Sequence, residues 1–287
     1  MKSRLIYLLF VLFLKSVSYG QNFEGKITDS ANGLPIPYCG IGIVNKAIGT
    51  VSGQDGRFDL NLSKAAIGDT LRVTEIGYSK KEHIINSNDK AGRNADVHLF
   101  KLGRLSFALD SVTIHPQGEL KYITIGNTVN SDFVCVGFSS SELGTEIGAV
   151  LKYRKHSHGL IESLNFNISK CLYDSVLFQV NLYNYDDGVI GASLLKRPII
   201  IEPKIRKGTL SVDVKDSSIV IYHDILLSLE LIRVSKRDLA DSSTFDKLAF
   251  NAGFFSSATY NRRASQDVWE KLPDAGVGFW AKVSYYK

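Results

Sequence analysis

Short runs in which apolar and polar residues alternate recur along the first third of the chain. They cover residues 23–27, 39–43, 58–62, 71–73, 84–85, 97–100 and 112–114. Gly, Pro and Asp-Gly turns separate them, and Asp55-Gly56 is a strong hairpin signal because both residue types tolerate positive φ. About seven short strands in roughly 95 residues predict a Greek-key β-sandwich of two sheets.

A change of parity marks one place in this region where the alternation breaks. Leu71 and Val73 continue the inward, apolar face, whereas Ile76 and Tyr78 have the opposite parity. Because side chains alternate strictly along a regular strand, we expect a strand end or a β-bulge near residues 74–75.

Beyond residue 116 the pattern stays typical of β-structure. Apolar runs occupy residues 133–138, 146–153, 160–168, 176–183, 199–201, 210–214, 225–234, 248–255 and 276–286. About nine strands predict a larger, jelly-roll-like β-sandwich. The run 225–234 is apolar enough for a central strand; a helix is its alternative, but nothing caps it and its neighbours are strands.

The run 176–183 shows the alternation most clearly. One face carries Val176, Phe178, Val180 and Leu182. Gln179 and Asn181 share the other face with Leu177 and Tyr183, and we expect this strand to be partly exposed to water, as in many antiparallel sheets. Asp187-Gly188 then breaks the chain.

The first twenty residues have the pattern of a secretory signal peptide. Lys2 and Arg4 precede an apolar run at residues 5–14, and Ser18 and Gly20 place small residues before a cut at Gln21. An uncleaved anchor is the alternative, but a membrane span needs about 20 apolar residues. We expect an exported protein that is periplasmic, outer-membrane-associated or secreted, with no transmembrane segment in the mature chain.

The predicted organisation is therefore a signal peptide at 1–20, a first β-sandwich at 21–116 and a second at 117–287. Pro116-Gln117-Gly118 marks a plausible boundary. The formal charge of the 287 residues is +5, and three of the 34 basic residues leave with the signal peptide while all 29 acidic ones stay. Such a balanced charge excludes a basic module, so no nucleic-acid partner is expected.

The glycine and proline spacing of the first sandwich carries a resemblance to a known family. The pattern consists of Gly-Lys-Ile-Thr-Asp at 25–29, Gly-Leu-Pro-Ile-Pro-Tyr at 33–38, Gly-Thr-Val-Ser at 49–52, Asp-Gly-Arg-Phe at 55–58 and Leu-Arg-Val-Thr-Glu-Ile-Gly-Tyr at 71–78. Over residues of about 22–115 it resembles the carboxypeptidase-like regulatory domain, a transthyretin-like β-sandwich common in envelope proteins of Bacteroidota-type bacteria. The resemblance implies no catalytic residues.

Two positions depart from that family's pattern. Cys39-Gly40 lies where members often have valine and asparagine, and Glu75 replaces a usual small polar residue. The second half has a weaker resemblance to a β-sandwich module found behind such regulatory domains, and this resemblance implies no function for particular residues.

The sequence shows no local motif for a metal, a cofactor or a catalytic group. Cys39 shares parity with buried positions and is expected to be inert, while a Cys135–Cys171 disulfide remains possible. His156 and His158 form the only close histidine pair in the sequence. Because their neighbours are basic, we expect a solvated loop there rather than a metal site. Zinc-peptidase and serine-hydrolase motifs are absent from the sequence, so no catalytic residue, metal or cofactor is predicted.

Aromatic residues near the C-terminus are the candidates for ligand binding. Tyr260, Trp269 and Trp280 could stack on sugars from a face of the second sandwich; filling of its core is the alternative. The sequence thus favours a non-enzymatic binding or assembly accessory whose partner is an envelope protein or a glycan. The alternative is a hydrolase on envelope polymers, with paired acids brought into one cleft by the fold.

Overall fold

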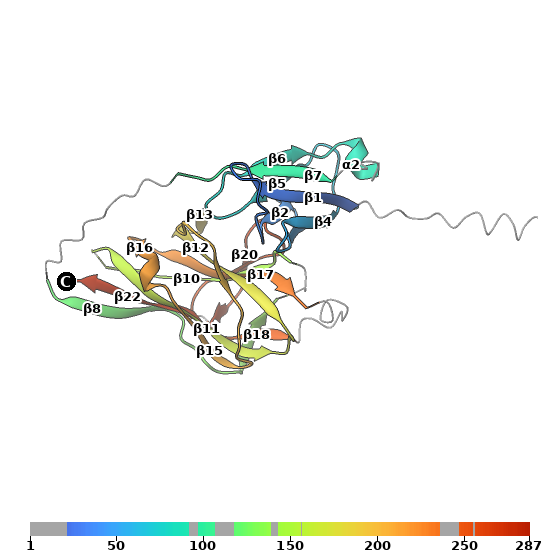
Figure 1. Cartoon of the computed structure of the whole chain (residues 1–287). Coiled ribbons are helices and arrows are strands. Elements are labelled where there is room, and N and C mark those ends of the chain that lie inside the picture. The colour runs from blue at the N-terminus through green and yellow to red at the C-terminus, as the bar shows by residue number, and fades with distance from the viewer. Residues whose placement is uncertain are drawn as a thin grey trace, which may run out of the picture.

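The computed structural model describes residues 22–91, 97–106, 118–138, 143–155, 157–235, 247–254 and 256–287. The expected signal peptide, the expected strand at 112–114, Pro116-Gln117 and His156 lie outside these ranges. Within them the chain is almost entirely β, with two pairs of sheets (Figure 1).

The first pair of sheets is built from strands β1 to β7. The elements are β1 (Asn22–Asp29), β2 (Gly40–Ile43), β3 (Gly49–Val51), β4 (Arg57–Asn61), β5 (Thr70–Thr74), β6 (Lys81–Ile84), α2 (Ser87–Ala91) and β7 (His98–Leu102). One sheet has the order β4-β1-β7 and the other β3-β2-β5-β6. These seven strands include β3, which was not among the expected runs, whereas the expected strand at 112–114 lies outside the described residues. Both sheets share one core, which includes Phe23, Ile27, Ile41 and Leu71. The predicted break near residues 74–75 is confirmed, because β5 ends at Thr74.

The second pair of sheets is built from strands β8 to β22. The elements are β8 (Leu120–Gly126), β9 (Val134–Gly137), β10 (Glu146–Leu151), β11 (Gly159–Cys171), β12 (Val176–Asp186), β13 (Val189–Ser193), β14 (Ile199–Ile201), β15 (Gly208–Asp213), η1 (Lys215–Ser217), β16 (Val220–Ile221), β17 (Ile225–Val234), β18 (Leu248–Phe254), β19 (Thr259–Arg262), β20 (Glu270–Leu272), β21 (Ala275–Val277) and β22 (Phe279–Tyr286).

These strands form a seven-stranded and an eight-stranded sheet. The first has the order β13-β12-β17-β10-β19-β20 with β14 on β12, and the second the order β21-β18-β11-β22-β8 with β15 and β16 on β11 and β9 on β18. Their inner faces share one large core that includes Phe166, Phe178, Leu229 and Phe250. The prediction of a central strand at 225–234 is confirmed, since β17 lies between β12 and β10.

The outer face of the seven-stranded sheet differs from the expectation. Gln179 and Asn181 on this face are only 6% and 2% exposed, so the prediction of a partly wet face is wrong at these two positions, whereas Tyr183 and Tyr185 farther along β12 are half-buried. The alternation itself is correct, because Phe178 and Val180 are buried in the core on the opposite side. Alternation shows which residues share a face, but it does not show what covers that face.

The first sandwich covers one end of this outer face (Figure 1). Val51 of the first sandwich forms an apolar cluster with Leu177 and Ile232 of the second. The Asn45 N–H donates to the Gln266 carbonyl at 2.9 Å, and the Gln266 amide donates to the Thr74 hydroxyl at 2.9 Å. The contact therefore combines apolar packing with specific hydrogen bonds.

The three cysteines are free thiols. Cys39 is fully buried, as expected, and burial raises its pKa far above the ordinary value. Cys135 is exposed and Cys171 is buried, so the possible disulfide between them is not formed. Among the residues described, no helix has the length and apolar character needed to cross a membrane.

Candidate ligand-binding groove

The outer face of the seven-stranded sheet carries polar and aromatic side chains at alternate positions. Antiparallel pairing arranges them in three rows across the strands. The rows are Arg262, Glu146, Glu230 and Gln179; Tyr260, Gly148, Ser228 and Asn181; and Val150, Leu226 and Tyr183. The first row is ionic and the third is apolar and aromatic, so the character of the face changes along the strands.

Aromatic rings gather at the end that the first sandwich leaves uncovered. The hydroxyls of Tyr185 and Tyr260 are 3.2 Å apart, with ring centroids at 5.9 Å. Trp269 meets Tyr183 edge to face at 5.9 Å, and the guanidinium of Arg262 lies 4.9 Å from the centroid of Trp269. Burial raises the pKa of Tyr185 to about 12, so this phenol stays protonated and can donate a hydrogen bond.

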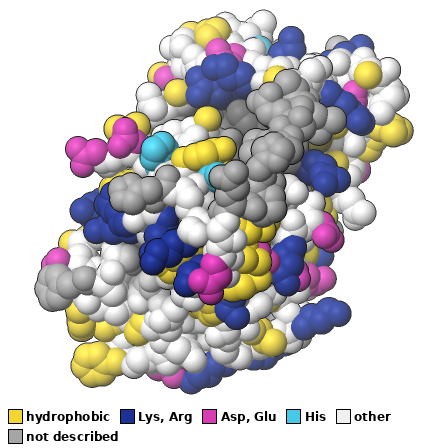
Figure 2. Space-filling view, turned by 90° about the vertical axis from the view of Figure 1, so that its left-hand side faces the viewer, with side chains coloured by type: hydrophobic (Ala, Val, Ile, Leu, Met, Phe, Trp, Pro, Cys, Tyr) yellow, Lys and Arg dark blue, Asp and Glu magenta, His cyan; other side chains and the backbone are white. Residues whose placement is uncertain are grey.

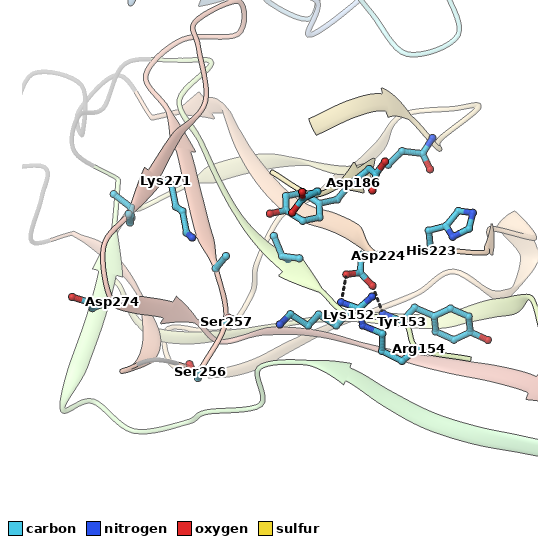
Figure 3. A pocket seen from close by; sticks show the side chains of 16 residues that line it. Lys152, Tyr153, Arg154, Asp186, His223, Asp224, Ser256, Ser257, Lys271 and Asp274 are labelled. Carbon is cyan, nitrogen blue, oxygen red and sulfur yellow. Dashed lines mark hydrogen bonds and ion pairs between the residues drawn. The ribbon is translucent and has the colours of Figure 1, made fainter. Parts of the chain in front are cut away.

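A groove of about 1010 Å³ opens beside these rings, where several strands begin or end. Its lining comes from residues 150, 152–154, 184–187, 223–224, 256–258, 271, 272 and 274. Figure 3 shows Lys271, Asp186 and Arg154 around the space, each from a different segment of the second sandwich. The turn at Asp187 and Gly188, with φ of 39° and 92°, ends β12 at its rim, as the sequence predicted.

The polar groups of the groove are held in place by their own contacts. The Asp224 carboxylate accepts a hydrogen bond from the Tyr153 N–H at 2.9 Å and pairs with Arg154 at 3.1 Å (Figure 3). Val150 and Leu272 supply apolar surface between the charged groups. The groove therefore offers fixed donors and acceptors above a partly apolar floor, which is the usual composition of a small-molecule site.

A buried ionic cluster separates the groove from the first sandwich. Glu146 pairs with Arg262, whose Nε donates at 2.6 Å. The Asn181 amide donates to Glu146 at 2.9 Å and to Glu230 at 3.2 Å, and the Ser265 hydroxyl donates to Glu230 at 2.8 Å. Nearly every charge in the cluster has a partner, as burial requires.

Two carboxyl groups of this region have raised pKa values. Burial, together with the charge of Glu146, raises the pKa of Glu230 to about 7. Burial raises the pKa of Glu75, on the facing surface of the first sandwich, to about 8. Its Oε2 is buried and has no hydrogen-bond partner among the residues that the structure describes. Both groups are therefore largely protonated at moderately acidic pH.

Glu146 and Glu230 lie directly opposite each other on β10 and β17, which makes them the closest match to the paired acids of a hydrolase. They are 0% and 5% exposed, and neither lines the groove. The carboxylates that do line it are Asp186, Asp187, Asp224 and Asp274. The acid pair therefore belongs to the packing of the sheet.

The three residues predicted to bind a ligand lie on two different sheets. Tyr260 and Trp269 belong to the aromatic cluster beside the groove, together with Tyr183 and Tyr185. Trp280 lies on β22 of the eight-stranded sheet, where its indole N–H faces Asn167 at 3.5 Å. Tyr260 and Trp269 thus lie on one sheet face beside the groove without lining it, and Trp280 lies on the other sheet, a separation that proximity in the chain could not show.

Several residues of the groove and of the sheet face beside it were not predicted as site residues from the sequence. Tyr183 and Tyr185 continue the outward parity of Gln179 and Asn181, so the alternation already placed them on one face. A glutamate within an apolar strand, such as Glu230, is a further signal, because a buried charge needs a partner. Lys271 and Asp274 carried no such signal, since only the tertiary fold brings their segment to the groove.

The expectation of no metal site rested on the lack of close Cys/His spacing. The structure brings His83, Asp89 and His98 together from separate segments of the first sandwich, with their possible ligand atoms within 4.8 Å of one another. Sequence spacing could not show this, because the fold makes the cluster. The described part of the chain therefore contains one group of side chains able to hold a metal ion.

These features define a protein of two packed β-sandwiches with an open groove on the larger one. Residues 23–114 match the CarboxypepD_reg-like domain family, so the protein carries a carboxypeptidase-like regulatory domain in its first third. This confirms the resemblance seen in the glycine and proline spacing. The regulatory-like domain is a β-sandwich without catalytic residues of its own.

Comparison over the whole chain gives only a distant likeness. A solved structure of the cysteine protease and lectin-like domains of Cwp84, a surface layer associated protein of Clostridium difficile, matches with a TM-score of 0.38 and 8% identity. The match covers 88% of this chain and 59% of that one, so this chain spans less than two thirds of that structure. Such a likeness assigns neither fold nor function. No curated protein matches the sequence.

Proposed function

We propose that the protein is an exported, non-catalytic binding protein of a bacterial envelope, and that the groove of its second sandwich holds a glycan. The observation that carries the proposal is the groove of about 1010 Å³ that adjoins the aromatic cluster of Tyr183, Tyr185, Tyr260 and Trp269. Export rests on the signal-peptide pattern of the first twenty residues.

The composition of the groove favours a sugar over an apolar or a strongly charged ligand. Sugar rings have apolar faces that pack against aromatic rings and hydroxyl edges that need donors and acceptors. Tyr185 supplies ring surface, while Asp186, Arg154 and Lys271 supply polar groups around it. The lining holds both acids and bases, so no single charge dominates. Figure 2 shows the same mixture of basic, acidic and hydrophobic side chains over one side of the molecule.

The arrangement of the carboxylates supports binding without turnover. The acid pair Glu146 and Glu230 is buried and engaged by Arg262, Asn181 and Ser265. In the groove, Asp224 is held by Arg154. The regulatory-like domain contributes packing to this arrangement: it covers the opposite end of the same sheet face and leaves the groove open.

A glycan array probed with purified protein tests the proposal. We expect wild-type protein to bind one class of envelope polysaccharide and to leave it intact. Tyr185→Ala removes an aromatic ring that lines the groove. Trp269→Ala removes a ring of the aromatic cluster that does not itself line the groove. Loss of an aromatic ring that stacks on a nucleic-acid base costs about 1–3 kcal/mol, and by analogy loss of the Tyr185 ring should weaken glycan binding at least about fivefold.

Trp280→Phe is the matched control, because it alters an aromatic residue on the opposite sheet. Binding should be unchanged in this variant. A silent array for the wild-type protein would overturn the glycan proposal. Equal loss in Trp280→Phe and Tyr185→Ala would move the site away from the groove, and shortened polysaccharide chains would indicate the hydrolase instead.

A further inference from the structure

Three side chains from separate segments of the regulatory-like domain meet far from the groove. His83 lies on β6, Asp89 on α2 and His98 on β7. The Nε2 of His83 is 2.9 Å from Asp89 Oδ2, and the Nε2 of His98 is 3.5 Å from Asp89 Oδ1. Both imidazoles therefore direct the same ring nitrogen at one carboxylate.

The surrounding structure fixes this arrangement. Phe23 stacks on the His98 ring with centroids 4.1 Å apart and lies 5.4 Å from the His83 ring. The Asn86 N–H donates to Asp89 Oδ2 at 2.9 Å, which holds the carboxylate in place. Packing and a backbone hydrogen bond thus orient the group before any ligand arrives, which lowers the cost of binding.

The three side chains of the cluster differ in their exposure to solvent. The Asp89 side chain is 0% exposed, whereas the His83 and His98 side chains are 26% and 24% exposed. A cation can therefore reach the imidazoles from solvent and meet a carboxylate that is shielded from it. The low dielectric around such a carboxylate strengthens its attraction for a cation.

The three groups are suitable ligands for a transition metal. Imidazole nitrogen and carboxylate oxygen are common Zn²⁺ ligands, at about 2.0–2.2 Å from the ion. Only neutral imidazole can coordinate, through the ring nitrogen that carries no proton. The ligand atoms, within 4.8 Å of one another, need a small contraction to reach these distances.

We propose that His83, Asp89 and His98 form a binding site for a divalent transition-metal ion such as Zn²⁺, with water on the open side. Because β6 belongs to one sheet of the domain and β7 to the other, the ion would link the two sheets directly. This site is independent of the groove. It holds whether or not the groove binds a glycan.

Titration calorimetry with ZnCl₂ on protein stripped of metal by a chelator tests the site. We expect one Zn²⁺ per chain and a rise in melting temperature on binding. His83→Gln and His98→Gln keep a side-chain donor near Asp89 but remove a ligand nitrogen. Because loss of an outer-shell partner alone costs about 10–100-fold in metal affinity, loss of a ligand should lower the affinity by about 100-fold or more. His158→Gln is the matched control; its ring lies 6.1 Å from Tyr222 in the second sandwich and should not affect binding.

A second measurement keeps the test independent of the variants' stability. Histidine-selective NMR of the wild-type protein should show Zn²⁺ shifting two imidazoles, assigned to His83 and His98. No Zn²⁺ binding by the wild-type protein, or binding that both glutamine variants retain at full strength, would overturn the proposal. In that case the three residues form only a structural hydrogen-bond network.

Discussion

Gly40 and Glu75, two of the three residues at which the sequence departs from the regulatory-domain pattern, lie at the contact between the sandwiches; the third, Cys39, is buried in the core of the first sandwich. A Cβ added at Gly40 would come within 2.9 Å of the Ser265 Cβ. The charge of Glu230 contributes to the raised pKa of Glu75, so the two carboxyls lie near each other across the contact. The departures at Gly40 and Glu75 are thus explained by packing against the second sandwich.

Glu75→Gln should make the protein less sensitive to pH. Burial raises the pKa of Glu75 from the ordinary 4.5 to about 8, so folding favours its protonated form. The stability this provides is full below pH 4.5 and is lost as the pH rises to about 8. Glutamine is neutral throughout. Urea unfolding should therefore show that the loss of stability between pH 5 and 8.5 is smaller in the variant by about 1 kcal/mol or more.

Glu119→Gln serves as its control, because the Glu119 side chain is 76% exposed. Its pH dependence should match the wild type. Identical pH profiles for Glu75→Gln and the wild-type protein would show that Glu75 is not buried in solution.

The three thiols should differ sharply in reactivity. Cys135 is exposed, whereas Cys39 and Cys171 are buried, and burial raises the pKa of Cys39 well above its ordinary range. Because the thiolate is the reactive form, one thiol per native chain should react with a disulfide reagent, and three after unfolding. Cys135→Ser should abolish the native reaction. Only one reactive thiol after unfolding would reveal a disulfide that the structure lacks.

At the scale of strands, the buried ion pair between Glu146 on β10 and Arg262 on β19 should contribute strongly to the free energy of unfolding. Arg262→Met leaves Glu146 buried without its cation, and breaking such a pair costs about 3–5 kcal/mol. Loss of the exposed Glu119–Lys121 pair in Glu119→Gln should cost less than about 1 kcal/mol. Denaturant unfolding compares the two, and equal effects would contradict the assigned role of the pair.

The absence of a side chain at Gly40 on β2 should determine how closely the two sandwiches pack. Gly40→Val places a branched side chain against Ser265 and should separate the sandwiches without unfolding either. Limited proteolysis should then cut the chain between them faster than in the wild type. At Gly103, by contrast, an added Cβ meets Ser79 at an ordinary 3.4 Å, so Gly103→Ala should be cut at the wild-type rate. An unchanged rate in Gly40→Val would mean that β2 does not form this contact in solution.

The fold was largely predictable at the scale of strands, and the site was not. Alternation located β12 and β17, and turn residues located the end of β12, because these signals are local. The partner that covers each face of a strand is set by contacts between segments that are far apart in the sequence. For that reason Trp280 was grouped with Trp269, the burial of Asn181 was missed, and the meeting of His83 with His98 was not foreseen.

Over the whole molecule, two different features share the outer face of the seven-stranded sheet. The regulatory-like domain packs on the end formed by Leu177 and Ile232, and the groove lies at the end formed by Val150 and Tyr185. The buried cluster around Glu146 lies between them. A rigid contact at one end would hold the strands that shape the groove at the other, so binding should depend on both sandwiches being folded together.

Hydrogen exchange with and without the glycan that the array identifies tests the central claim most directly. We predict protection confined to residues 150–154, 184–187, 223–224, 256–258 and 271–274, with the glycan recovered at its original length. Protection centred on β22 and β8 around Trp280, or recovery of a shortened glycan, would contradict a non-catalytic site in the groove.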